Sequence, residues 1–377
     1  MIGHQLYAAN QVNLGAILTT IAMDLKIPLS ISGTIATLFA VGIIVSSILG
    51  TFTIRRKNLK PVLFFGIFLF SVFALLEGFS SSTWDLSLYR FGLGVGEGLW
   101  NISYFSFLGL LFAEIRGLLS SLAGNMYNLG LIWAYPFMVI MTSLSGSWRI
   151  PLYILGLLGI FTSFLLLVMV PSTRSDHNMD SNLKLNSSTR RNRNVSLGSL
   201  IGFISAVIFF AVANFYPTYL ITRGFSPEFS SLIMSIQGWS MFVSRPPILY
   251  LSDKQGRKRW LYFASILSIP VTYLMFNLHH SDFTPTAAIS IIYGIVSGLS
   301  FPLTLVFIQD SVAKDSIIYA TSVYNAAYYT GGAITGFVTS SIISTMGWEV
   351  VGAFLALLSF MLFLAVAATK EIKLTLK

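Results

Sequence analysis

Residues 251–259 read Leu-Ser-Asp-Lys-Gln-Gly-Arg-Lys-Arg, a short polar run between two long apolar stretches, 227–251 and 259–278. An α-helix needs roughly 20 apolar residues to cross a bilayer, and each stretch is about that long. Four basic side chains crowd the run, and Gly256 allows a tight turn. Because Lys and Arg concentrate in cytoplasmic loops, the run predicts a cytoplasmic turn between two membrane helices.

The rest of the 377-residue chain has the same membrane-protein composition. Hydrophobic residues make up 55% and charged residues 10%, against roughly 25% charged in an average soluble domain. The mean hydropathy of +0.76 excludes a soluble enzyme, a disordered protein and a single-span receptor. Backbone polar groups in hydrocarbon must be satisfied within each segment, so we predict an all-α membrane protein with twelve transmembrane helices. The apolar stretches are 5–23, 32–54, 61–80, 84–112, 117–143, 149–170, 198–222, 227–251, 259–278, 285–309, 316–345 and 348–369.

The basic residues predict the orientation of the chain. With both termini placed inside, eighteen of the 23 Lys and Arg fall in inner loops, and only Lys26, Arg149 and Arg223 fall in outer ones. The positive-inside rule then predicts a multi-pass protein of the cell membrane with both termini cytoplasmic. The net charge of +9 is an orientation signal, and we expect no nucleic-acid partner.

The two halves of the chain resemble each other. A polar stretch rich in Ser, Asn and Arg, 171–196, separates six predicted helices in 1–170 from six in 197–377, and predicts a cytoplasmic linker. Tyr127-Asn128 in the first half is matched by Tyr324-Asn325 in the second, at an offset of 197 residues. Trp148 and Trp348 follow at an offset of 200. Chance recurrence of common membrane residues is the alternative, but the six-plus-six layout favours two pseudo-symmetric bundles.

The run at 251–259 resembles the inner loop between the second and third helices of each half of major facilitator superfamily transporters, G-x-L-[SA]-D-[RK]-x-G-[RK]-[RK]. Leu249 stands where the pattern has its first Gly. A merely basic loop would leave Asp253 and Gly256 unexplained. The counterpart in the first half keeps a Gly and basic residues but lacks the Asp. The resemblance implies a conformational latch made by Asp253, Gly256, Arg257, Gly50 and Arg55.

The fourth apolar stretch carries Arg90 and Glu97 among glycines. Its R-x-x-x-G pattern also resembles the superfamily, and the added Glu resembles the organic anion:cation symporter branch. Seven residues are nearly two helical turns, so both side chains share one face about 10 Å apart. Ionisable groups within membrane helices are costly and usually functional. We predict that Glu97 takes up and releases a proton under the influence of Arg90; the alternatives are a structural ion pair and an Arg90 that only extends its charge toward the membrane surface.

The first apolar stretch departs from that branch. Its relatives carry Asp-Arg before an Asn-Leu, whereas this chain reads Asn10-Gln11-Val12-Asn13-Leu14. The arginine that would hold a carboxylate is missing, so organic-anion specificity is not simply inherited. The amides of Asn10 and Gln11 hydrogen-bond either a polar solute or neighbouring helices.

Further polar and aromatic residues at membrane depth are candidates for lining a solute site. For each of them, helix packing is the alternative. Arg245 is a candidate cation for a carboxylate or phosphate, unless it pairs with Asp253 or backbone. Glu77 and Asp310 lie at the ends of predicted helices and are expected to be boundary residues; the alternative is a role in a proton relay. The complete set of predicted solute-binding residues is Gln11, Asn10, Tyr127, Asn128, Asn214, Tyr216, Gln237, Arg245, Tyr324, Asn325 and Tyr328.

Missing motifs narrow the function further. The sequence has no Walker motif, no zinc-protease or serine-hydrolase motif, and no cysteine. We therefore expect no enzyme activity, no metal and no cofactor. The leading hypothesis is a monomeric secondary transporter that moves a small polar organic solute, organic anions included, by symport with protons or Na⁺. The alternatives are a proton-antiport exporter of amphipathic compounds and a non-transporting membrane receptor on the same fold.

Overall fold

The computed structural model describes residues 1–377 except 55–58, 112–115, 171–191, 279–282, 314–315 and 371–377. All regular structure in these described residues is α-helical, which confirms the predicted all-α architecture. The chain divides into two compact units, Met1–Ser181 and Asn182–Lys377. The predicted linker 171–196 falls mostly outside the described residues, so the domain boundaries stay predictions.

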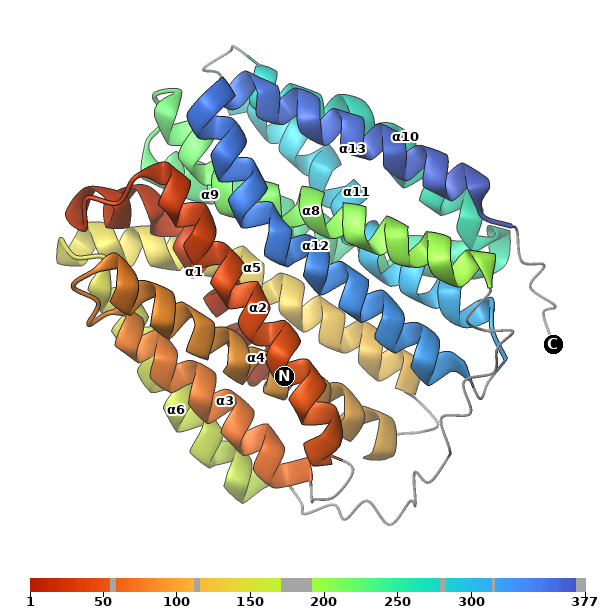
Figure 1. The fold of residues 1–377 in the computed structure, drawn as a ribbon, viewed down its shortest axis with the longest axis horizontal. Helices are drawn as coiled ribbons and strands as arrows, with labels where there is room; N and C mark the ends of the chain where they lie inside the picture. Colours follow the sequence, from red (N-terminus) through yellow and green to blue (C-terminus); the bar gives the residue numbers. More distant parts are fainter. Residues whose placement is uncertain (55–58, 112–115, 171–191, 279–282, 314–315, 371–377) are drawn as a thin grey trace. The chain divides into compact units, whose positions relative to one another are not determined.

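Each unit contributes six helices to the described structure (Figure 1). Over their described residues, seven of the twelve helices are long and apolar enough to cross a membrane by length and composition alone. In the first unit the helices are α1 (Ile2–Asp24), α2 (Leu29–Ile54), α3 (Leu59–Glu77), α4 (Thr83–Leu111), α5 (Arg116–Ser145) and α6 (Arg149–Met169). In the second they are α8 (Arg193–Thr222), α9 (Pro227–Gln255), α10 (Arg257–Asn277), α11 (Phe283–Asp310), α12 (Ile317–Met346) and α13 (Trp348–Ala368).

The helix pairings repeat between the units. Among described residues, the most extensive pairings in the first unit are α1 with α5, α2 with α4, α3 with α4, and α3 with α6. In the second unit they are α8 with α12, α9 with α11, α10 with α11, and α10 with α13. The second set is the first set shifted by one six-helix repeat, which supports duplication over chance recurrence.

Glycines mark equivalent crossing points in both units. A Cβ on Gly94 would lie 2.0 Å from the carbonyl oxygen of Phe39, and one on Gly294 would lie 2.6 Å from that of Gln237. Both distances are far below van der Waals contact, so only glycine lets these helix pairs approach so closely. Gly294 follows Gly94 by 200 residues, and Gln237 follows Phe39 by 198. The same contact between a glycine and a backbone carbonyl is therefore made once in each unit.

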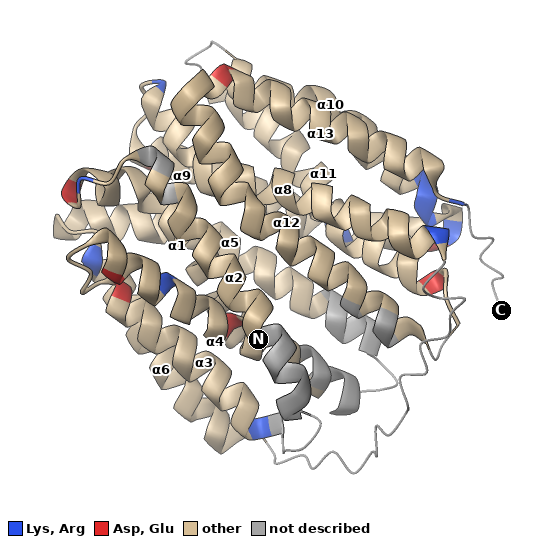
Figure 2. Ribbon diagram, viewed as in Figure 1, with Lys and Arg blue, Asp and Glu red and all other residues tan. Residues whose placement is uncertain are grey.

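Charged residues are concentrated at the helix ends. Figure 2 shows the described helices of each unit mostly tan along their length, with few blue or red positions between their ends. A charge inside the hydrocarbon layer costs stability unless it is paired or functional. The few interior charges in the described part of the chain therefore direct attention to the first unit, where Arg90 and Glu97 are buried.

Candidate functional site

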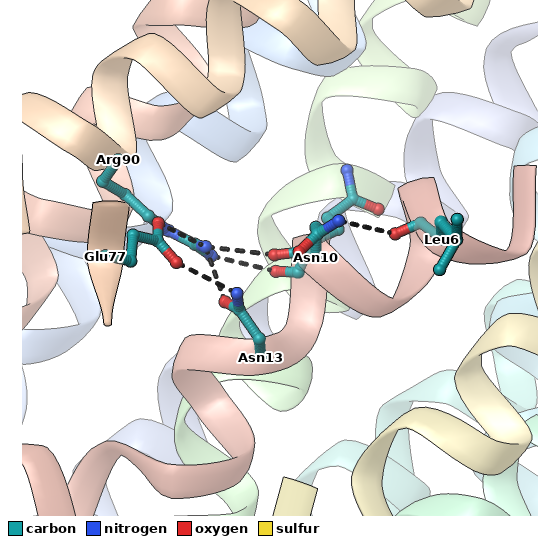
Figure 3. A network of polar contacts seen from close by, with 6 residues as sticks. Leu6, Asn10, Asn13, Glu77 and Arg90 are labelled. Atoms are coloured by element: carbon teal, nitrogen blue, oxygen red, sulfur yellow. Dashed lines mark hydrogen bonds and ion pairs between the residues drawn. The ribbon is translucent and has the colours of Figure 1, made fainter. Parts of the chain in front are cut away.

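The centre of the site is Arg90 of α4, whose side chain is only 1% exposed (Figure 3). Its Nη1 donates to Asn13 Oδ1 at 2.6 Å and lies 3.3 Å from Glu77 Oε1. Its guanidinium carbon lies 4.6 Å from the centre of the Phe39 ring. The planar guanidinium offers five donors in a fixed geometry, which suits it to join several acceptors at once.

Two backbone carbonyls of α1 also accept from Arg90. Nη1 donates to the Asn10 oxygen at 3.0 Å, and Nη2 donates to the Gln11 oxygen at 3.2 Å. The same helix has non-helical backbone angles at Ile17, one to two turns further on. Arg90 thus fixes the polar segment of α1 against α4.

Glu77, the last residue of α3, completes this network. It is 2% exposed, and its Oε2 accepts from Asn13 Nδ2 at 3.0 Å. We expected Glu77 to be a boundary residue. It does lie at a helix end, but it is buried because Arg90 and Asn13 converge on it. The ion pair of Arg90 is formed with Glu77 and not with Glu97.

Glu97 is fully buried, and neither carboxylate oxygen has a hydrogen-bond partner in the described structure. Among the described residues, the charged groups close enough to interact with it electrostatically are Arg90 and Glu77. Burying an unpaired carboxylate costs several kcal/mol, a cost that protonation removes. The site thus holds one guanidinium and two acids, of which only one acid is paired.

An aromatic group that the sequence analysis missed lies on α1 and α4 of the same unit. The His4 ring stacks on Tyr7 at 5.1 Å and on Tyr104 at 4.8 Å, and Trp100 stacks on Tyr104 at 4.9 Å. Trp100 Nε1 also donates to His4 Nδ1 at 3.4 Å. The i, i+3 spacing of His4 and Tyr7 and the i, i+4 spacing of Trp100 and Tyr104 were the available signals.

The predicted solute residues of the first unit lie next to this group. Tyr127 of α5 donates to the side chain of Gln11, and its ring centre is 5.9 Å from that of Tyr7. Asn10 donates to the Leu6 carbonyl at 3.0 Å, a contact within its own helix. Asn128 is fully buried, and both of its amide atoms are without a partner in the described structure. The structure therefore brings Gln11 and Tyr127 together. Asn10 and Asn128, their neighbours in the sequence, are buried.

In the second unit, several predicted residues make packing contacts. Tyr324 is fully buried against Val195, Ile308 and Ala320, and its hydroxyl donates to the Phe301 carbonyl at 3.0 Å. Such contacts are expected if Tyr324 serves to pack the helices, which was the alternative to solute binding. A solute role for Tyr324 stays a prediction.

Tyr216, Gln237 and Asn214 are also buried in the second unit. Tyr216 packs edge-on against Phe276 at 5.5 Å, and Gln237 Nε2 donates to Ser290 Oγ at 3.5 Å. Tyr216 also lines a cavity of about 40 Å³ with Arg223 and Thr286, room for a few waters at most. Their solute roles stay predictions as well.

Arg245, Asn325 and Tyr328 are partly exposed. Arg245 Nε donates to the Gly298 carbonyl at 3.1 Å, so the backbone alternative accounts for at least one of its donors. Tyr328 packs edge-on against Phe301 at 4.7 Å. Arg245 and Tyr328 are close enough to interact electrostatically, which places both near the same part of the unit.

The predicted latch of the second unit is a compact ion cluster. Asp253 Oδ1 lies 2.7 Å from Arg257 Nη1, and Arg257 Nε also pairs with Asp310 at the end of α11. Gly256 has φ of +93°, a conformation that a side chain disfavours. The sequence analysis expected Asp310 to be a boundary residue and did not predict this contact with Arg257. Of the first-half counterpart, Gly50 lies in α2 with its surroundings outside the described residues, and Arg55 is itself outside them.

No cluster of three or more His, Cys, Asp or Glu that could hold a metal ion occurs among the described residues. Among the acids buried in the described part of the first unit, only Glu97 has two carboxylate oxygens without a hydrogen-bond partner. The arrangement can bind and release a proton at Glu97 while Arg90 stays neutralised by Glu77.

Comparisons with known proteins identify the family of the chain. The family model of the Major Facilitator Superfamily matches residues 1–230 and 198–373. The chain is 24% identical over 291 residues to the MFS-type transporter YfkF of Bacillus subtilis, covering 74% of this chain and 71% of that protein. It is 26% identical over 179 residues to the sphingosine-1-phosphate transporter SPNS2 of Xenopus tropicalis, covering 47% of this chain and 35% of that one.

Solved structures share the fold. The D-xylose-proton symporter superimposes with a TM-score of 0.79 at 16% identity, covering 97% of this chain and 94% of that one. A bacterial homolog of the human lysosomal transporter Spinster superimposes with a TM-score of 0.78 at 15% identity, covering 97% of this chain and 95% of that one. The nucleoside transporter NupG superimposes with a TM-score of 0.72 at 18% identity, covering 98% of this chain and 99% of that one. Together with the family match over nearly the whole sequence, these likenesses show that the chain is a multi-pass membrane transporter, not an enzyme, and that it belongs to the Major Facilitator Superfamily.

Proposed function

We propose that this transporter moves a small polar organic solute by alternating access, in symport with protons that bind Glu97. We place it in the cell membrane as a monomer with both termini cytoplasmic. The D-xylose-proton symporter among its structural neighbours makes this mode of coupling plausible for the fold. The proposal for this chain rests on its own residues.

The unpartnered carboxyl group of Glu97 carries the proposal. A purely structural acid inside a membrane helix is expected to be paired, as Glu77 is. Glu97 is buried without a hydrogen bond in the described structure, so its charged form is costly and its protonated form is not. Such a group is suited to carry a proton across the membrane when its surroundings change between two conformations.

The solute side of the proposal rests on neutral polar groups. Gln11 and Tyr127 form a hydrogen-bonded pair beside the aromatic rings, and Asn128 offers an unpartnered amide. Arg90 is already neutralised by Glu77. An organic anion would therefore depend on Arg245, and a neutral polar solute on the amides and tyrosines of the first unit. Asn10, Asn214, Tyr216, Gln237, Tyr324, Asn325 and Tyr328 complete the proposed set.

Purified protein in proteoliposomes tests the coupling. A panel of radiolabelled D-xylose, uridine, L-alanine and L-lactate is first screened at pH 6 and pH 8 for solute-dependent thermal stabilisation, which mass action requires of any ligand that binds the folded state. The stabilising solute is then followed under an imposed pH gradient. We expect accumulation with the inward proton gradient, loss of that accumulation in Glu97→Gln, and retained exchange of solute for solute.

The matched control is Asp85→Asn, which removes a partly exposed acid in the first turn of the same helix. This variant should accumulate solute like the parent protein. Gradient-driven accumulation by Glu97→Gln at the parent rate would remove Glu97 from the coupling mechanism.

Proton antiport is the second candidate, favoured by the aromatic group of His4, Tyr7, Trp100 and Tyr104. Stacked rings suit an amphipathic compound, and the matched transporter from Xenopus tropicalis is named for one, sphingosine-1-phosphate. The same proteoliposomes separate the two directions, since an antiporter drives solute against the proton flux. Stabilisation by a solute without any flux would instead indicate a receptor.

A further inference from the structure

The buried charges of the first unit are arranged unequally around Arg90. One acid, Glu77, uses both of its oxygens: Oε1 lies 3.3 Å from Arg90 Nη1, and Oε2 accepts from Asn13 at 3.0 Å. The other acid, Glu97, uses neither. Glu97 nevertheless shares its helix and its helix face with Arg90, whereas Glu77 comes from a different helix, α3.

Asn13 fixes this choice of partner. Its Oδ1 accepts from Arg90 and its Nδ2 donates to Glu77, so one amide holds both ends of the ion pair in register. The carbonyls of Asn10 and Gln11 occupy further donors of the guanidinium. All of these contacts draw the end of the Arg90 side chain toward α1 and the end of α3 (Figure 3).

We infer that Glu77 is a positioning residue for proton coupling: by neutralising Arg90, it prevents the guanidinium from holding Glu97 in its charged form, and so keeps Glu97 able to bind a proton. This inference rests on the proposed role of Glu97 as the proton site. It assigns to Glu77 a function that its place at a helix end does not suggest.

The other elements packed near α4 bring few competing charges. α2 has no acidic or basic residue between Leu29 and Ile54, and α5 has none after Arg116, its first residue. Lys60 of α3 lies seventeen residues before Glu77, about 25 Å along the helix. On α1, His4 lies within the aromatic group and Asp24 at the far end of the helix. Among the charges whose positions the structure describes, Arg90 and Glu77 are thus the ones that act on the proton affinity of Glu97.

Infrared spectroscopy of the protein in lipid tests this without knowledge of the solute. The carbonyl stretch of a protonated buried carboxylic acid is followed as a function of pH, and its absence in Glu97→Gln assigns it to Glu97. In Glu77→Gln, Arg90 is left without its counter-charge, so the midpoint of this titration should move to lower pH. A full charge at about 10 Å in a protein interior corresponds to a shift of about one pH unit, a tenfold change in proton affinity.

Arg90→Gln makes the opposite change, because the negative charge of Glu77 is then uncompensated. In this variant the titration midpoint of Glu97 should move to higher pH by a similar amount. The double variant Glu77→Gln/Arg90→Gln removes both charges and should return the midpoint to within about 0.3 pH unit of the parent protein. If Glu77 had a purely structural role, the two single variants would not shift the titration midpoint of Glu97 in opposite directions, and the double variant would not return it to the parent value. If Glu77→Gln does not fold, Arg90→Gln and the double variant still decide the matter.

Single variants that shift the midpoint in the same direction, or not at all, would overturn the inference. Failure of the proposed function looks different: either the infrared band survives Glu97→Gln, or Glu97→Gln retains gradient-driven accumulation. In the second case the influence of Glu77 on the proton affinity of Glu97 is still measured, and only its use in transport is lost.

Discussion

Asp24, at the end of α1, lies 2.8 Å from Nη1 of Arg149, at the start of α6. The corresponding pair of the second unit has the charges exchanged: Arg223 follows the end of α8, and Glu349 lies in the first turn of α13, 3.8 Å apart. The offsets are 199 and 200 residues, as expected for duplicated halves. The contact between the two helix ends has been kept in both units although its polarity has been reversed.

Exchanging the charges of the first pair should therefore be tolerated better than removing one of them. We expect Asp24→Arg alone to lower the melting temperature in detergent by about 1–3 °C, because a partly exposed ion pair contributes about 0.2–1 kcal/mol. Asp24→Arg/Arg149→Asp should recover most of this loss. Recovery will be partial, since the Trp148 indole, which donates to Asp24 at 2.9 Å, loses its acceptor. A double variant less stable than the single one would show that polarity matters at this contact.

The same pair should make stability depend on pH in a defined direction. Hydrogen bonds from Trp148 and Arg149 lower the pKa of Asp24 below its ordinary value. A lowered pKa stabilises the folded state above the ordinary value of about 3.9, and this contribution is lost as the pH falls through the lowered value. The difference in melting temperature between the parent protein and Asp24→Asn should be constant from pH 7 to pH 5 and shrink below pH 4. A difference that grows on acidification would contradict this assignment.

Most of the fold could be predicted from the sequence. The predicted stretch 149–170 matches α6 at Arg149–Met169, and the predicted turn at Gly256 ends α9. Bilayer thickness and the distribution of basic residues set helix number and ends, and both can be read from a single sequence.

The site could be predicted only in part. The apolar pattern correctly placed Arg90 and Glu97 in one helix, where both are buried, but it cannot show which residue of another helix faces them. Glu77 pairs with Arg90 because α3 and α4 pack together, and Asn13 joins both because α1 reaches the same end. Tyr324 illustrates the converse limit: a tyrosine at membrane depth fits a pocket or a core equally well until its neighbours are known.

The glycine crossing of α2 and α4 makes a strong prediction for stability. Gly94→Ala places a methyl group where the carbonyl oxygen of Phe39 lies 2.0 Å away, so the two backbones must separate. We expect a loss of about 2–3 kcal/mol or more in unfolding free energy, measured by thermal unfolding in detergent. Gly294→Ala, at the equivalent crossing in the second unit, should be similarly costly. Leu88→Ala is the control, since this α4 side chain is 63% exposed and should change stability little.

The latch of the second unit predicts a local opening that can be detected chemically. Arg257 joins Asp253 to Asp310 and donates from Nη1 to the buried hydroxyl of Ser252 at 3.4 Å. The chain has no cysteine, so Ser252→Cys provides a single thiol under the cluster. In this background, Arg257→Gln should raise the rate of maleimide labelling about tenfold, because losing the bridge lowers the free energy of local opening by about 1.4 kcal/mol. Lys254→Gln removes an exposed cation of the same turn and should leave the rate within about twofold; equal labelling in the two variants would mean that Arg257 does not hold this end of the unit closed.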